Sequence, residues 1–162
     1  MPKIDCPVTS GVRFLQERGI VFLPHLYPYV DHGGTAQAAK CLKVEHHAVI
    51  KTLVMNSELR RPFLVLMHGD REVSTKQLAR ILNVKKIEPC DRTLAQKLTG
   101  YQVGGISPFG TRTQLEVCVE SSVLLLERIY INGGKQGFLV EINPKDLAHA
   151  FAFTPIDVAI KG

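Results

Sequence analysis

Several features of secreted and metal-binding proteins are missing from this 162-residue sequence. It has no tryptophan, and its cysteines are few, widely spaced and without a C-x-x-C pair. Such spacing argues against a zinc site or a disulfide framework and favours a reducing compartment. We therefore expect a cytoplasmic protein whose cysteines are free: Cys6, Cys41, Cys90 and Cys118.

Long hydrophobic runs are also missing. The longest, at residues 63–67 and 123–126, are far too short to span a bilayer. The first six residues have no apolar segment of the kind found in secretion signals. We expect neither secretion nor a membrane partner.

The familiar catalytic motifs are absent too. A phosphate-binding G-x-x-x-x-G-K-[ST] does not occur, and the nucleophile elbow G-x-S-x-G fails because Phe109, not glycine, follows two residues after Ser107. His46 and His47 form the one close histidine pair, and neighbours on a strand point to opposite faces. We expect no metal and no cofactor, while a Cys–His nucleophilic pair stays open.

The remaining composition is that of a globular chain, with 45% apolar and 22% charged residues. Its length predicts a single domain over residues 1–162. The net charge of +5 permits nucleic acid as a partner without requiring it. Six basic residues on two neighbouring helices and their connection form either one basic patch or an ordinary solvated face: Lys76, Arg80, Lys85, Lys86, Arg92 and Lys97.

Periodicity and turn residues predict a mixed α/β sheet. Helices are expected at 10–18, 36–42, 75–82, 92–98 and 144–150, with caps at Thr9 or Ser10, Thr35, Ser74 and Asp91. Strands are expected at 20–29, 48–55, 62–68, 85–88, 115–119, 128–131, 136–142 and 155–160. Residues 48–55 and 62–68 form an antiparallel hairpin covered on both faces, and residues 132–135 form a second hairpin turn.

Two features could carry chemistry. Residues 99–110 hold four glycines and a proline, so the backbone could leave amides open to a phosphate or an oxyanion, although a plain tight turn is an alternative. Lys51 lies on an apolar strand, where an ammonium is costly unless it reaches a polar cleft or water at the strand end.

These features resemble a known family. The sequence Thr99-Gly100-Tyr101, followed by Gly104-Gly105-Ile106-Ser107-Pro108-x-Gly110, resembles the signature loop of the YbaK family. Members are free-standing relatives of the editing (insertion) domain of bacterial prolyl-tRNA synthetase. Residues 49–53 resemble the family's central strand with its lysine, and 129–137 its glycine-rich hairpin. The likeness runs from about Tyr29 to the C-terminus.

The resemblance implies an α/β fold with a mixed, partly barrel-like β-sheet flanked by helices. It also implies hydrolysis of mischarged aminoacyl-tRNA in trans, assisted by the tRNA's own ribose hydroxyl, with prolyl-tRNA synthetase as a possible partner. Lys51 would be catalytic, set against the ester or its neighbouring phosphate, and the amides of residues 104–107 would hold the terminal adenosine. Substrate contacts would come from Tyr29, Thr52, Gly104, Gly105, Ile106, Ser107, Pro108, Asn132, Gly134 and Leu139.

Three departures concern the amino acid that is removed. The segment between Tyr29 and Lys51 is shorter than in members that act on Cys-tRNA(Pro), and it lacks their Asn-Phe-Gly phenylalanine. Asn132 replaces a serine, and Leu139 replaces an aspartate. The less polar pocket favours Cys or Ala over Ser or Thr, hence Cys-tRNA(Pro) or Ala-tRNA(Pro). The alternatives are a non-catalytic module that docks on tRNA or a synthetase, and an enzyme for another small ester or amide.

Overall fold

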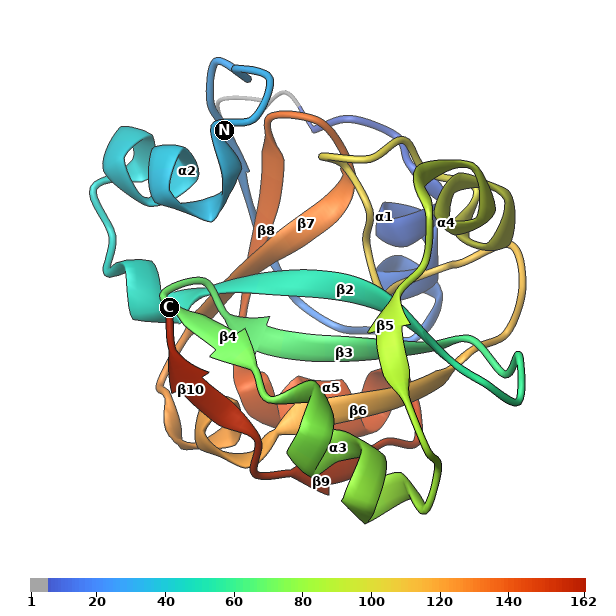
Figure 1. The fold of residues 1–162 in the computed structure, drawn as a ribbon. Coiled ribbons are helices and arrows are strands. Elements are labelled where there is room, and N and C mark those ends of the chain that lie inside the picture. Colours follow the sequence, from blue (N-terminus) through green and yellow to red (C-terminus); the bar gives the residue numbers. More distant parts are fainter. Residues whose placement is uncertain (1–5) are drawn as a thin grey trace.

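The structure is a computed structural model that describes residues 6–162, arranged around a mixed β-sheet (Figure 1). The expected absence of a secretion signal rested largely on Met1–Asp5, which lie outside the described residues. Within residues 6–162, no helix is both long enough and apolar enough to cross a bilayer.

The main sheet has eight strands in the described residues, in the order β1-β8-β7-β2-β3-β6-β9, with β5 pairing with β2 off this path. Strand β2 runs antiparallel to β3 and parallel to β7, so the expected mixed sheet flanked by helices is confirmed. Strands β4 and β10 form a separate pair. The strands are β1 (Leu23–Leu26), β2 (Val49–Ser57), β3 (Phe63–His68), β4 (Arg71–Val73), β5 (Ile87–Pro89), β6 (Glu116–Glu120), β7 (Ile129–Lys135), β8 (Phe138–Ile142), β9 (Thr154–Ile156) and β10 (Ala159–Lys161).

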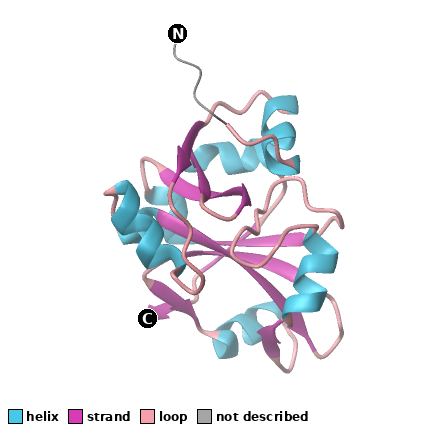
Figure 2. Cartoon of the chain, turned by 90° about the horizontal axis from the view of Figure 1, so that it is seen from above, coloured by secondary structure: helices cyan, strands magenta, loops and turns pink. Residues whose placement is uncertain are grey.

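Helices lie around the sheet when it is viewed from above (Figure 2). Three expected caps are confirmed, because the side chains of Thr9, Ser74 and Asp91 accept backbone N–H groups of the first helical turn. The α-helices of the described residues are α1 (Ser10–Glu17), α2 (Gly34–Leu42), α3 (Thr75–Leu82), α4 (Arg92–Thr99) and α5 (Leu147–Ala150), with 3₁₀ turns η1 (His46–Ala48), η2 (Ser121–Leu125) and η3 (Pro144–Asp146).

The β2–β3 hairpin carries the core on both of its faces, as expected. Every residue of β3 is buried. Its side chains alternate between two clusters, with Leu64 and Leu66 in one and Phe63, Val65 and Met67 in the other. A strand buried on both faces must be apolar at odd and even positions alike, which is the pattern that the sequence shows.

The expected turn at residues 132–135 is wrong. These residues continue β7, and the reversal falls between Lys135 and Phe138, with a β-bulge between Asn132 and Lys135. The Asn132 carboxamide oxygen accepts the backbone N–H groups of Gly134 and Lys135 at 2.6 and 3.1 Å. The side chain thus supplies the bonds that a regular ladder would have made, which lets the strand run on through two glycines.

Other boundaries were also misjudged. Thr35 does not cap α2, because the helix begins at Gly34 and the Thr35 hydroxyl instead bonds His46 Nε2 at 2.8 Å. The expected strand at 20–29 shrinks to β1, an edge strand that contains Pro24, while Pro28, which lacks the N–H that a ladder needs, lies beyond its end. The expected last strand at 155–160 divides into β9 and β10, which pair with different partners.

Candidate functional site

A gap in the sheet beside β2 creates the candidate site. On the side of β2 away from β3, strand β7 pairs at Val49 and Ile50, and β5 pairs from Met55 onward. Between these two pairings, no strand of residues 6–162 covers Lys51 and Thr52 on that side. The edge of β2 there has no neighbouring strand, and Lys51 and Thr52 line a cavity.

This cavity, which we call the β2 cavity, has a volume of about 380 Å³. That size is within the range of small-ligand sites. Its walls come from β2, the β1–α2 connection, α2, the glycine loop, β7 and β8. Part of the wall is apolar, formed by the clustered residues Tyr27, Ala38, Val49 and Leu139. The polar and charged wall residues include Lys51, Thr52 and Arg92.

Lys51 places a positive charge on the cavity wall, as does Arg92. The Lys51 side chain is 18% exposed, and its Nζ lies 3.3 Å from Oε1 of Glu72 on β4, whose side chain is 62% exposed. A largely solvated carboxylate gives only weak stabilisation to such a pair. The ammonium therefore has a partner at rest that an anionic ligand could replace.

The hydroxyl of Thr52 has no partner. Its Oγ1 is buried and makes no hydrogen bond in the part of the chain that the structure describes. An unsatisfied buried hydroxyl costs about 1–3 kcal/mol and is uncommon in folded proteins. Thr52 lines the β2 cavity through other atoms, so a bound molecule would become the partner of this hydroxyl once the side chain turns toward the cavity.

The glycine loop, residues 99–110, forms one wall and is tied down by Asn132. The Asn132 Nδ2 donates to the carbonyls of Gly104 and Lys135 at 3.3 and 3.2 Å, while Asn132 Oδ1 accepts two N–H groups of the bulge. The carboxamide is thereby fully occupied, so Asn132 shapes the wall instead of offering free groups. The Gly105 amide donates to Gln102 O at 2.8 Å and is not open, contrary to the expected row of free amides.

Seven of the residues expected at the site line the β2 cavity: Tyr29, Lys51, Thr52, Gly104, Ile106, Asn132 and Leu139. The other four lie elsewhere. Gly105 backs onto Gln136, and Gly134 contacts Tyr101 and Thr9. Ser107 is buried, with its hydroxyl accepting Phe109 N–H at 3.1 Å, and Pro108 lines a different hollow.

Two further wall residues were not among those expected at the site. Arg92, the first residue of α4, lines the cavity, although the sequence offered it only as one member of a basic patch. Its chain position gave no further signal, since the fold alone brings α4 to β2. Tyr27 also lines the cavity; the sequence offers it, like Tyr29, as a tyrosine that could stack on a base, although a buried tyrosine is the commoner case. Burial, together with neighbouring Tyr29 and Cys41, raises the pKa of the Tyr27 phenol.

A histidine cluster lies near the site, at the open end of the β2–β3 hairpin, where β2 begins and β3 ends. One ligand atom from each of His47, His68 and Asp70 lies within 4.8 Å of the others. The geometry does not suit a metal. The two imidazoles stack face to face at 3.6 Å, and both His68 nitrogens are already bonded, to His47 O and Ser122 Oγ at 2.7 Å each. Ring lone pairs lie in the ring planes, so stacked rings cannot both aim at one ion.

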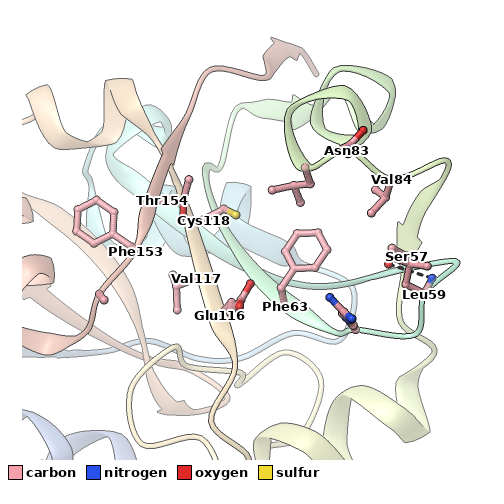
Figure 3. A pocket seen from close by; sticks show the side chains of 13 residues that line it. Ser57, Leu59, Phe63, Asn83, Val84, Glu116, Val117, Cys118, Phe153 and Thr154 are labelled. Carbon is pink, nitrogen blue, oxygen red and sulfur yellow. Dashed lines mark hydrogen bonds between the residues drawn. The ribbon is translucent and has the colours of Figure 1, made fainter.

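A larger cavity of about 560 Å³ lies at the far end of the hairpin, between the α3–β5 connection and β6 (Figure 3). It contains none of the expected site residues. Cys118 on its wall has its pKa raised to about 11 by burial, with a contribution from Glu116. A thiol that stays protonated at neutral pH is a poor nucleophile, so this cavity offers no support for a Cys–His mechanism.

Comparison with known proteins shows the family to which the chain belongs. The sequence profile of the "Aminoacyl-tRNA editing domain" family matches residues 32–150. EbsC of Enterococcus faecalis, to which Cys-tRNA(Pro)/Cys-tRNA(Cys) deacylase activity is ascribed, is 25% identical over 138 residues, covering 85% of this chain and 84% of EbsC. A proline–tRNA ligase of Desulforamulus reducens is 28% identical over 110 residues, covering 67% of this chain but 19% of the ligase.

Solved structures show the same fold. A candidate trans-editing enzyme for prolyl-tRNA synthetase superposes with a TM-score of 0.83 at 21% identity, over 96% of this chain and 99% of that one. A second protein, described as hypothetical, superposes with a TM-score of 0.85 at 22% identity, over 94% of this chain and all of the other.

Proposed function

We propose that this chain, which belongs to the aminoacyl-tRNA editing domain family, hydrolyses the ester of mischarged aminoacyl-tRNA as a free-standing deacylase. One observation carries the proposal: Lys51 and Thr52 line one cavity with residues of the glycine loop. The cavity has the size of a small-ligand site, and its wall has apolar as well as polar and charged residues, as suits an aminoacyl-adenosine.

The reaction needs little from the protein. An aminoacyl ester is already activated, so the protein must place water and stabilise charge on the carbonyl oxygen. Water adds to the carbonyl carbon, the bond to the ribose oxygen breaks, and that oxygen takes a proton to give free amino acid and uncharged tRNA. The ribose hydroxyl next to the ester assists the proton transfers, so no Ser-His-Asp set is required.

Lys51 supplies the fixed positive charge in this scheme. Its Nζ would leave Glu72 for the developing oxyanion or the neighbouring phosphate. The Thr52 hydroxyl would bond a polar atom of the aminoacyl-ribose, and Tyr29 and Ile106 would flank the terminal adenosine. Gly105, Ser107, Pro108 and Gly134 would act by shaping the loop and hairpin, since they lie outside the cavity wall.

The apolar part of the cavity wall is the basis for proposing which amino acid is removed. Leu139 is almost fully buried there and clusters with Ala38 and Val49. We propose a small, weakly polar residue, Cys or Ala, on tRNA(Pro), with prolyl-tRNA synthetase as a partner in the cytoplasm. Editing exists because a synthetic site separates small side chains poorly; a difference of one methylene, for example, gives only about 10–200-fold discrimination.

A deacylation panel tests this function. Purified protein is incubated with tRNA(Pro) charged with Cys, Ala, Ser or Thr, with and without prolyl-tRNA synthetase, and the remaining ester is measured. Hydrolysis of the Cys or Ala ester above that of the Ser and Thr esters is the expected result. Turnover of none would favour a non-catalytic docking module, and cleavage of free aminoacyl esters as fast as charged tRNA would favour a general esterase.

A further inference from the structure

A second cavity, on the opposite side of the glycine loop from the β2 cavity, has no part in the scheme above. It has a volume of about 360 Å³ and is lined by the loop and by the end of the β7–β8 hairpin, and we call it the loop–hairpin cavity. Its lining residues are Tyr29, Gly100, Tyr101, Gln102, Gly105, Gly134, Lys135 and Gln136.

Tyr29 joins the two cavities. Its side chain is half-buried and lines both of them. The Tyr29 hydroxyl lies so close to Gly104 that a Cβ on that glycine would overlap with it, and a Cβ on Gly105 would fall 2.6 Å from Gln136 N. The partition between the cavities is therefore bare backbone with one aromatic ring at its end. Because Tyr29 lines both cavities, the loop–hairpin cavity is the neighbouring hollow for a chain that continues beyond the β2 cavity.

The chemistry of the lining suits a nucleotide. Lys135 is exposed, and its ammonium makes no ion pair among residues 6–162. Gln102 adds an exposed carboxamide, and Tyr29 presents an aromatic face. Proteins bind single-stranded RNA with cations for the phosphates, polar groups for the base edges and aromatic rings for stacking.

The position of Lys135 is fixed by the fold. Its backbone N–H donates to Asn132 Oδ1 at 3.1 Å and its carbonyl accepts Asn132 Nδ2 at 3.2 Å. On the next residue, Gln136 Nε2 donates to Val103 O at 2.8 Å, which ties the hairpin to the loop. The hairpin is thus held to the loop at Gly104 and at Val103, with Lys135 between the two attachments.

We propose that the loop–hairpin cavity binds the nucleotide that precedes the terminal adenosine, with the Lys135 ammonium on its phosphate. The inference rests on the proposed deacylase function, because only then does a single-stranded 3′ end enter the β2 cavity. The proposed subsite would make aminoacyl-tRNA bind more tightly than a free aminoacyl nucleoside. Lys135 would bind the substrate and take no part in the chemistry.

The test compares two substrates that carry the same amino acid: aminoacyl-adenosine, which fills the β2 cavity alone, and aminoacyl-tRNA. Lys135→Ala should raise KM for the tRNA about tenfold, the worth of one charge-assisted contact, and leave hydrolysis of aminoacyl-adenosine unchanged. The slope of log(kcat/KM) against log[salt] for the tRNA should fall in magnitude by about 0.7, the value for one phosphate of a single strand. Lys135→Arg should restore both.

Lys145→Ala is the matched control, since this exposed lysine follows the end of β8 opposite the β7–β8 turn. Thermal melting of each variant verifies folding. An unchanged KM and salt slope in Lys135→Ala, or an equal change in Lys145→Ala, would overturn the subsite while leaving the deacylase function standing. If the wild-type protein hydrolysed neither substrate, the deacylase function would fail and the subsite with it.

Discussion

The ammonium of Lys51 lies 3.3 Å from the carboxylate of Glu72, and the two side chains differ sharply in exposure, at 18% and 62%. The lysine belongs to a cavity wall and the glutamate to the surface. Because Glu72 can be rehydrated without cost to the fold, Lys51 can exchange this partner for an anionic ligand. The pair therefore keeps the Lys51 ammonium at the site while leaving it free to bind a ligand.

Replacing Lys51 with alanine should lower kcat about 10²–10³-fold, the usual cost of removing one group that stabilises an oxyanion. Lys51→Arg should keep more of the activity because the charge remains. Stability should change by less than about 1 kcal/mol, since the ion pair with Glu72 is open to solvent on one side. Single-turnover deacylation and urea denaturation measure the two effects, and a fully active Lys51→Ala protein would refute the role.

Thr52→Val should raise the stability of the free protein and lower its activity. Removing the unpaired buried hydroxyl should stabilise the free protein, by up to about 1–2 kcal/mol, because a buried polar group without a bond is costly. The same change should lower kcat/KM if the substrate supplies the missing partner. Thr52→Ser, which keeps the hydroxyl, is the control. A Thr52→Val protein that is less stable and equally active would contradict this account.

Gly105→Ala should disturb the loop by steric overlap, without strain from a positive φ. An added Cβ would meet Gln136 N at 2.6 Å and Lys135 C at 2.8 Å, both backbone atoms that cannot swing aside. We expect a loss of about 1–3 kcal/mol, as for other overpacked sites, together with reduced activity. Gly19→Ala is the comparison, because Gly19 has φ +67° but open space around it, so its cost of about 1–2 kcal/mol should spare activity. Equal activity in both variants would argue against the loop's role.

His68 should make stability depend on pH. Burial lowers its pKa below the ordinary 6.5, partly opposed by the bond from its Nδ1–H to His47 O. The unfolded chain therefore takes up a proton at higher pH than the folded chain does. Stability is full above pH 6.5 and falls as the pH drops below 6.5 toward the lowered pKa.

His68→Gln should flatten this dependence, even though the variant is less stable overall. The comparison of its unfolding free energy with that of the wild type between pH 5 and 7.5 isolates the His68 contribution. Glu120 changes stability in the opposite sense, since burial raises its pKa, but it does so equally in both proteins. Parallel curves for the two proteins would show that His68 does not titrate as described.

Local rules allowed the sequence to predict much of the fold. The caps at Thr9, Ser74 and Asp91 depend on one side chain and the next three residues, and all three are present. The β2–β3 hairpin followed from two apolar runs around a polar loop. Where a local rule had a tertiary competitor it failed: Thr35 bonds His46 instead of capping its helix, and Asn132 turns a glycine pair into a bulged strand.

Local patterns in the chain were enough to predict most helices and strands, the two-sided burial of the β2–β3 hairpin and the residues that resemble an editing family. The folded arrangement was needed to show that β7 leaves β2 before β5 joins it, which opens the cavity at Lys51 and Thr52. It also decided that Arg92 lines that cavity and that Lys135 lies on the far side of the glycine loop. The reason is physical, because propensities and caps act over a few residues, whereas a cavity is the space left where distant strands stop pairing.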